Sequence, residues 1–196
     1  SDAVLLSKTS TDLTNASDYK LYIDSDDQSL TWLVGDPTVD CASLSVPVSS
    51  QLRLNRWQHI AASFDHTSGQ IALFIDGQLI DSCTPGSPSS AKAPSNDADL
   101  IIGNGVEVGS PAKAMIAAVN LSKSVKYTQQ FIPQTELLDA ASAAYWKFQQ
   151  ATGAFDISGN EHDGAILALW WSEFCPEADS DGDGIYEDCE GNNLSE

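Results

Sequence analysis

The fold is decided by one stretch near the middle of the chain, Ile71-Ala72-Leu73-Phe74-Ile75-Asp76-Gly77-Gln78-Leu79-Ile80. Asp-Gly between two apolar runs is the strongest short-range signal for a β-hairpin. A third apolar run, from His59 to Phe64, precedes the hairpin and ends at Asp65. The three runs together predict three consecutive antiparallel strands.

Further short apolar runs lie on both sides of this stretch. The sequence predicts strands over 19–23, 30–34, 100–102, 115–121, 145–148 and 165–171. Residues 135–144 follow a proline and contain Leu137 and Leu138, and this segment alone favours a short helix. Many short strands separated by turn residues are typical of an antiparallel sandwich or barrel. The predicted fold class is therefore all-β.

The run Trp57-Gln58-His59-Ile60-Ala61 and the hairpin after it resemble the central hairpin of laminin-G-like jelly-roll domains. These domains belong to the concanavalin A-like fold, which also includes the pentraxins. The segments 100–103, 131–133, 145–148 and 156–164 are similar to later parts of the same family pattern. The resemblance covers residues 3–172 and implies an antiparallel two-sheet jelly-roll sandwich. We accordingly expect residues 1–174 to form this domain.

The chain departs from the family pattern in two places. Many relatives have two strands before the segment that matches residues 3–8, so the resemblance implies a sandwich with an open sheet edge. Backbone groups on an open edge pair readily with another chain. Many relatives also carry acids near a bound calcium in the strand that matches residues 115–120, where this chain has Ile116-Ala117-Ala118-Val119. We expect no calcium site on that strand.

The residues from 175 to 196 form a separate acidic segment. Its centre is Asp179-Ser180-Asp181-Gly182-Asp183-Gly184-Ile185-Tyr186-Glu187-Asp188-Cys189-Glu190, which has the spacing of a calcium-binding loop. Such a loop supplies oxygens from alternating acids, a backbone carbonyl and a closing carboxylate, with glycine at the sharp turn. The predicted Ca²⁺ ligands are Asp179, Asp181, Asp183, Ile185, Glu187 and Glu190. The loop resembles a thrombospondin type 3 repeat or a dockerin loop, although Asp is more usual than Glu at its last position.

Four Cys residues give an even count, which suits a secreted protein with two disulfides. Three pairings are possible. Cys175 and Cys189 flank the calcium loop, which favours a bridge between them and leaves Cys41 with Cys83. No Cys and His have the spacing of a zinc site. Sequons for N-glycosylation begin at Asn15, Asn120 and Asn193.

Net charge and apolar run length exclude several classes of partner. The chain carries 9 Lys and Arg against 28 Asp and Glu, which gives a net charge of −19. This surplus repels phosphate backbones and anionic lipids, so we expect neither nucleic-acid binding nor a basic membrane-binding patch. No apolar run approaches the ~18 residues of a membrane span, so we expect no membrane insertion. The chain begins without Met and without a signal peptide, and we expect a processed, extracellular or cell-surface protein.

No residue pattern in the chain predicts an enzyme. Glycosidases of this fold carry Glu-x-Asp-x-Glu on one strand, and the nearest match, Glu161 with Asp163, lacks the final Glu. No nucleophile motif accompanies the histidines, which are His59, His66 and His162.

Two function hypotheses remain, ahead of a glycosidase with a displaced site. The first is a non-catalytic, calcium-binding structural or adhesion module, such as a filament subunit, whose partners are copies of itself or another extracellular protein. The second is a lectin-like module that binds glycans. Neighbouring strand residues face opposite sides, so one of Trp170 and Trp171 is expected to face outward. With Tyr186 they form a candidate patch for a glycan or protein partner.

Overall fold

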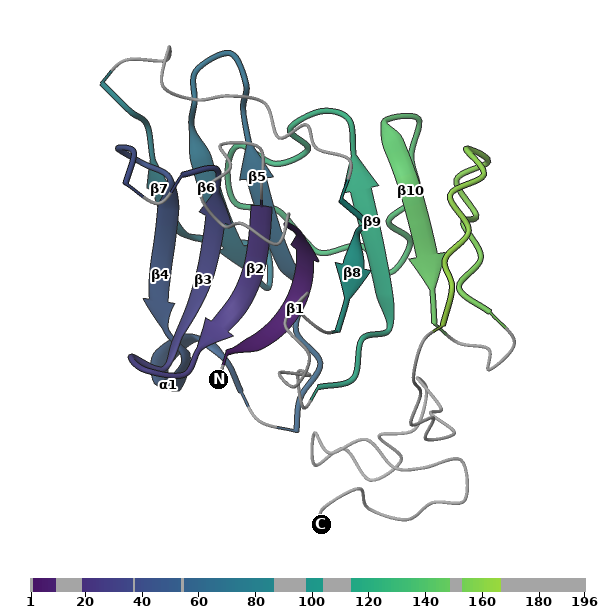
Figure 1. Ribbon diagram of the computed structural model, residues 1–196, viewed down its shortest axis with the longest axis horizontal. Helices are drawn as coiled ribbons and strands as arrows, with labels where there is room; N and C mark the ends of the chain where they lie inside the picture. The colour runs from purple at the N-terminus through teal and green to yellow at the C-terminus, as the bar shows by residue number, and fades with distance from the viewer. Residues whose placement is uncertain are drawn as a thin grey trace. The chain divides into compact units, whose positions relative to one another are not determined.

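The computed structural model (Figure 1) describes residues 2–9, 19–36, 38–53, 55–86, 98–103, 114–148 and 153–166. Its contacts divide the chain into two compact units. Unit 1 comprises Ser1–Leu52, His59–Met115 and Ser124–Pro133; unit 2 comprises Arg53–Gln58, Ile116–Lys123 and Gln134–Glu196. Within the described ranges, no helix is both long enough and apolar enough to cross a membrane. The predicted domain boundary at residues 174 and 175 lies outside the described residues.

Unit 1 is built from two antiparallel sheets. The first has the order β4-β3-β2-β1-β8, and the second has the order β5-β6-β7. The strands of the first sheet are β1 (Ala3–Lys8), β2 (Tyr19–Asp24), β3 (Ser29–Val34), β4 (Ser43–Pro47) and β8 (Ile101–Ile102). Those of the second are β5 (Ile60–Phe64), β6 (Ile71–Ile75) and β7 (Gln78–Cys83), and a single helical turn, α1 (Val48–Gln51), follows β4. The arrangement is consistent with a concanavalin A-like sandwich.

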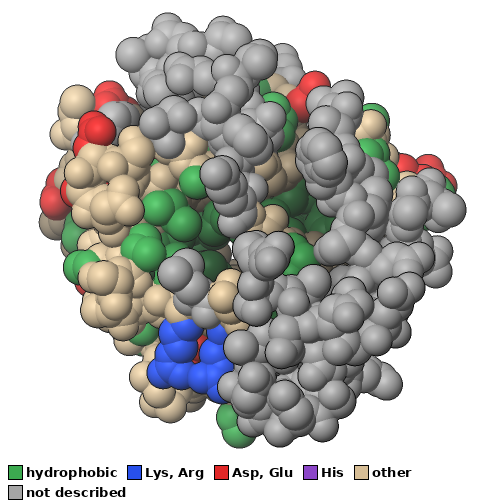
Figure 2. Space-filling view, turned by 90° about the horizontal axis from the view of Figure 1, so that it is seen from below, with side chains coloured by type: hydrophobic (Ala, Val, Ile, Leu, Met, Phe, Trp, Pro, Cys, Tyr) green, Lys and Arg blue, Asp and Glu red, His purple; other side chains and the backbone are tan. Residues whose placement is uncertain are grey.

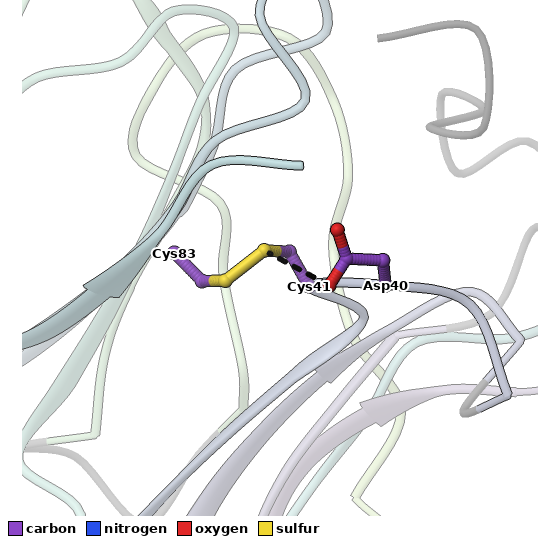
Figure 3. Close-up of side chains that lie close together, drawn as sticks. All are labelled: Asp40, Cys41 and Cys83. Atoms are coloured by element: carbon purple, nitrogen blue, oxygen red, sulfur yellow. Dashed lines mark hydrogen bonds between the residues drawn. A yellow bond between two sulfur atoms is a disulfide. The ribbon is translucent and has the colours of Figure 1, made fainter. Parts of the chain in front are cut away.

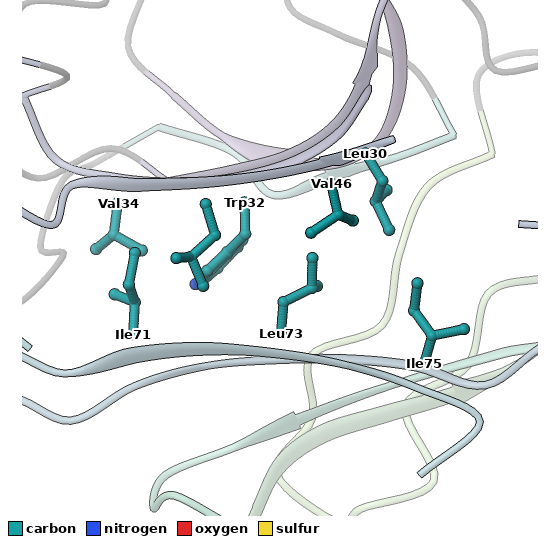
Figure 4. Close-up of a cluster of buried hydrophobic side chains, with 8 residues drawn as sticks. Leu30, Trp32, Val34, Val46, Ile71, Leu73 and Ile75 are labelled. Carbon is teal, nitrogen blue, oxygen red and sulfur yellow. The ribbon is translucent and has the colours of Figure 1, made fainter. Parts of the chain in front are cut away.

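The core of unit 1 lies between these two sheets (Figure 4). Alternate residues of a strand face the same side, so every second apolar residue of β3, β4 and β6 enters the core. The buried side chains are Leu30, Trp32, Val34, Leu44, Val46, Ile71, Leu73 and Ile75. The indole N–H of Trp32 donates to the backbone carbonyl of Ser63 at 3.1 Å, which satisfies its one polar atom and links the sheets.

Strand β6 is buried on both faces. Its five residues, Ile71 to Ile75, are each at most 7% exposed. On the face opposite the core, Phe74 lies 5.6 Å from the ring of Phe131 and 6.3 Å from that of Tyr127. A strand with two apolar faces is expected to appear in sequence as an unbroken apolar run, which is what this segment shows.

Unit 2 has a two-stranded antiparallel sheet of β9 (Ala118–Ser122) and β10 (Ser142–Lys147). Its buried apolar residues, within the described ranges, are Ala144, Tyr145 and Trp146, all on β10. The indole N–H of Trp146 donates to the carbonyl of His162 at 2.9 Å, and Trp146 also forms an isolated bridge with Asp156. Strand β10 therefore anchors the loop that follows it in the chain.

Most of the predicted strands are confirmed. The runs 19–23, 30–34, 59–64, 71–75, 79–80 and 100–102 correspond to β2, β3, β5, β6, β7 and β8. Strand β9 begins later than residue 115, and β10 begins earlier than residue 145. The predicted strand over 165–171 falls mainly on residues outside the described ranges. Strand β4 was not anticipated, although its exposed and buried residues alternate strictly, with Leu44 and Val46 inward.

The prediction of a short helix over 135–144 is wrong. In the structure this segment is irregular until Ser142, where β10 begins. The Asp139 carboxylate accepts the backbone N–H of Ala141 at 2.9 Å, and the Ser142 N–H donates to the Asp139 carbonyl. Such local bonds from a short polar side chain compete with helical hydrogen bonds. The burial of Ser142 and Ala144 in the sheet then favours a strand.

Candidate functional site

A disulfide between Cys41 and Cys83 is the one covalent cross-link among the described residues (Figure 3). Cys41 lies in the turn before β4, and Cys83 is the last residue of β7, so the bond joins the two sheets of unit 1. The two Cα atoms are 5.4 Å apart, within the range that a disulfide requires. This pairing is the one that the sequence favoured.

The carboxylate of Asp40 lies beside this disulfide. In the part of the chain that the structure describes, Asp40, Cys41 and Cys83 are the one group of possible metal ligands whose atoms all approach within 4.8 Å. The two sulfurs are bonded to each other and offer no thiolate, which is the form of Cys that binds metals. Asp40 Oδ2 instead accepts the backbone N–H of Gly86 at 3.4 Å. The cluster is a structural cross-link and not a metal centre.

Removing this disulfide is expected to lower the stability of the sandwich. The bond closes a loop with a sequence separation of 42 residues. Replacing Cys41 and Cys83 by Ser should reduce the free energy of unfolding by about 2–4 kcal/mol, because the unfolded chain regains the entropy that the closed loop removes. Urea unfolding followed by circular dichroism measures the difference. A matched double substitution of Cys175 and Cys189 by Ser should leave the sandwich transition in place; equal losses in the two variants would contradict the prediction.

The most extensive polar network of the described residues is centred on Asp156, in the loop 156–164, which we call the Asp156 loop. Oδ1 of Asp156 accepts the backbone N–H groups of Tyr145 and Ser158, both at 2.9 Å. Oδ2 accepts the Ser158 hydroxyl at 2.9 Å and the backbone N–H of His162 at 3.1 Å. The side chain has no exposed surface. Both oxygens are therefore occupied by groups of the loop and of β10.

These bonds determine the ionisation of Asp156. Burial alone opposes the charged carboxylate, but the N–H groups of Tyr145, Ser158 and His162 and the Ser158 hydroxyl outweigh it. They hold the pKa of Asp156 well below its usual range. A carboxylate that is ionised and fully hydrogen-bonded is a poor proton acceptor. Asp156 therefore fits a structural role and not that of a general base.

His59 lies in an aromatic cluster of unit 1. Its ring meets those of Phe131 and Tyr127 edge-on, with centroid distances of 5.4 Å and 6.2 Å. Burial lowers its pKa, although the nearby Asp76 carboxylate opposes that shift. Within the described ranges, its buried Nδ1 has no hydrogen-bond partner. The imidazole packs as a neutral ring, and no described nucleophile is hydrogen-bonded to it.

Comparison with known protein families agrees with the sandwich topology and with the hairpin at Asp76-Gly77. A family model described as the concanavalin A-like lectin/glucanases superfamily, in its laminin G-like branch, matches residues 1–130. The chain belongs to the concanavalin A-like superfamily. The match ends before β10 and the Asp156 loop, so it covers less of the chain than the resemblance read from the sequence. No curated protein and no solved structure matches significantly.

Several predicted site residues of this concanavalin A-like protein lie outside the described residues. They comprise the calcium ligands Asp179, Asp181, Asp183, Ile185, Glu187 and Glu190, the cysteines Cys175 and Cys189, the patch Trp170, Trp171 and Tyr186, and the sequons at Asn15 and Asn193. The third sequon, at Asn120, lies in β9. Asn120 Nδ2 donates to the Leu137 carbonyl and to the Ser142 hydroxyl, and glycosylation, which replaces one of its two hydrogens, would remove at least one of these bonds.

Proposed function

We propose that this concanavalin A-like protein is a non-catalytic, extracellular, calcium-binding structural or adhesion module that assembles with copies of itself or another extracellular protein. The observation that carries the proposal is the loop Asp179 to Glu190, whose acids at positions 1, 3, 5 and 12 and glycine at position 6 match a calcium loop. An acidic tail that is only solvated would not require this spacing of acids and glycine. The cross-link of Cys41 with Cys83 supports an oxidising, extracellular location.

The acidic segment and the sandwich each have a role in the proposed assembly. The segment 175–196 acts as one thrombospondin type 3-like loop closed by a Cys175–Cys189 bridge, which limits the entropy lost when the metal binds. The sandwich forms a jelly roll, and assembly uses an open sheet edge, the C-terminal segment or both. A subunit of a cell-surface or extracellular filament would combine these features, with Ca²⁺ ordering the segment that reaches a neighbour.

Absence of catalysis is also part of the proposal. Of the two acids nearest to a glucanase pattern, Glu161 is exposed and Asp163 accepts the backbone N–H of Asp156 at 2.8 Å. Asp163 therefore helps to fold the Asp156 loop. A glycosidase needs two carboxylates that face one bond, and these residues lie in the irregular Asp156 loop rather than side by side along one strand.

A lectin-like module is the second candidate. The superfamily description names lectins beside glucanases, and Trp170, Trp171 and Tyr186 supply aromatic faces of the kind that stack on sugars. Retention of the wild-type protein on a glycan array, with loss after Trp170 and Trp171 are replaced by Ala, would favour this candidate over assembly.

Calcium should control the mass of the particles that the full chain forms. In calcium, light scattering is expected to show particles much larger than one chain, and chelator should return them to about one chain's mass. Asp181→Ala should abolish both the large particles and one equivalent of calcium in a calorimetric titration, because it removes a predicted ligand from the loop. Asp27→Ala, which removes one exposed turn carboxylate, is the matched control. A monomer with and without calcium would refute assembly.

A further inference from the structure

Both arginines of the chain lie in one exposed turn. Arg53 and Arg56 are three residues apart, and each side chain is exposed. The backbone N–H of Arg53 donates to Gln58 Oε1 at 2.6 Å, and Asn55 adopts a left-handed conformation with φ of 55°. The bond to Gln58 ties one end of the turn to the other. We call residues 53–58 the arginine turn; Leu54 within it is outside the described residues.

The arginine turn lies in a long region without acidic residues in a very acidic chain. Residues 41–64 contain no Asp or Glu, although the chain has 28 of them. Among the residues that the structure describes, neither guanidinium takes part in an ion pair. On the face drawn in Figure 2, Lys and Arg side chains gather in one place, and most Asp and Glu side chains lie toward the rim. The arginine turn carries two positive charges in a chain whose net charge is −19.

Guanidinium groups select a particular class of partner. Each offers a planar fork of N–H donors that matches a carboxylate with two parallel hydrogen bonds. Two such forks, three residues apart, fit a peptide with several carboxylates close together. The longest segment of this kind is 175–196, which holds eight Asp or Glu and no Lys or Arg.

We propose that the arginine turn binds the acidic segment 175–196 of a second copy of this chain. The proposal rests on the proposed assembly function and names the surface that performs it. The two surfaces differ from each other but occur on every copy, so the contact is head-to-tail. A bound pair therefore leaves one arginine turn and one acidic segment unused. Contacts of this type continue into rings or open chains rather than stopping at a dimer. The association depends on exposed charges and should weaken as salt rises.

Three acids of the segment are not predicted calcium ligands, namely Glu177, Asp188 and Glu196. They remain available to arginine when calcium occupies the loop. This separation allows the contact to be removed without removing the metal site. The arginine variant is R53Q/R56Q, and the acid variant is E177Q/D188N/E196Q. Both keep every predicted ligand, so calorimetric calcium titration of each tests the proposed function independently of the contact.

The decisive experiment is complementation between the two variants of the full chain. In low salt with saturating calcium, wild type should form a ladder of species in analytical ultracentrifugation, and each variant alone should remain monomeric. A 1:1 mixture should give a dimer and nothing larger, because the arginine variant supplies an intact acidic segment and the acid variant an intact arginine turn. K123Q/K126Q, which removes two exposed charges with the same spacing, is the matched control and should keep the ladder.

Other outcomes would overturn the proposal. A monomeric wild type, an arginine variant that still forms the ladder, or a mixture that stays monomeric would each exclude the contact between copies. Binding of wild type but not of R53Q/R56Q to a sulfated polysaccharide, without self-association, would assign the arginine turn to polyanions instead. Circular dichroism of each variant checks the fold. Loss of calcium binding with an intact ladder would refute the calcium loop but leave the arginine turn as the contact.

Discussion

Replacing Gly77 by Ala is expected to destabilise unit 1 by about 2–5 kcal/mol. Gly77 has a positive φ of 78° and follows Asp76, whose φ is 51°, so both central residues of the hairpin turn are left-handed. An L-residue loses about 1–2 kcal/mol in this conformation. A Cβ at Gly77 would also overlap the backbone carbonyl of Phe131 and lie 2.9 Å from Cδ of Pro133. Overpacking against rigid backbone adds about 1–3 kcal/mol.

The close approach at Gly77 has a structural purpose. The Phe131 N–H donates to the Gly77 carbonyl at 2.9 Å, which fixes the segment 124–133 against the hairpin. That contact places Phe131 beside Phe74 and His59. Relief of the overlap would therefore require Phe131 to leave its place, and the aromatic cluster would loosen with it.

Gly159→Ala is the matched control for this substitution. Gly159 has a similar φ of 84°, but a Cβ added there would meet no atom within 4 Å, so only the conformational cost applies. Urea unfolding of both variants by circular dichroism separates the two effects. A Gly77→Ala loss no larger than that of Gly159→Ala would show that the approach of Phe131 is not tight.

The hairpin is the part of the fold that sequence predicts best, because its signal is local. Asp76-Gly77 suits a turn with two positive φ angles, and the apolar runs on either side need no distant partner to be recognised. The pairing of Cys41 with Cys83 also followed, since the position of the other two cysteines around one loop left few choices. The hairpin signal depends on residues that are near one another in sequence, whereas Cys41 and Cys83 are 42 residues apart and their pairing followed by elimination.

The structural features that the sequence did not predict depend on contacts between residues that are distant in sequence or on competing local hydrogen bonds. Strand β4 contains Ser43, Ser45 and Pro47 on its exposed side, and only its pairing with β3 makes Leu44 and Val46 core residues. The segment 135–144 has helix-forming Leu and Ala, but the Asp139 turn and the burial of β10 override that propensity. Arg53 and Arg56 belong to no recognisable motif, and in the sequence only the absence of Asp and Glu from residues 41–64 distinguishes them.

Asp156→Ala is expected to lower the free energy of unfolding of unit 2 by about 3–5 kcal/mol at neutral pH. The carboxylate is the acceptor for three backbone N–H groups and one hydroxyl, and hydrogen bonds to a charged group are each worth about 1.5–3 kcal/mol and are not additive. Removing it leaves donors of Tyr145, Ser158 and His162 without an acceptor. Asp163→Ala, which removes a carboxylate bonded to one backbone N–H, should cost about 1–2 kcal/mol and is the matched control.

The pH dependence of this difference follows from the depressed pKa of Asp156. The folded-state pKa lies below the unfolded value of about 3.9, so the carboxylate's contribution is fully present above that value. It is lost as pH falls through the folded-state pKa, because protonation of Asp156 removes the charge that its donors stabilise. The gap in unfolding free energy between wild type and Asp156→Ala should therefore be constant from pH 7 to about pH 5 and shrink at lower pH. Urea unfolding at a series of pH values measures this gap. A gap that does not change between pH 5 and pH 2 would mean that the charge of Asp156 does not hold the loop, and that its side chain acts only by filling space.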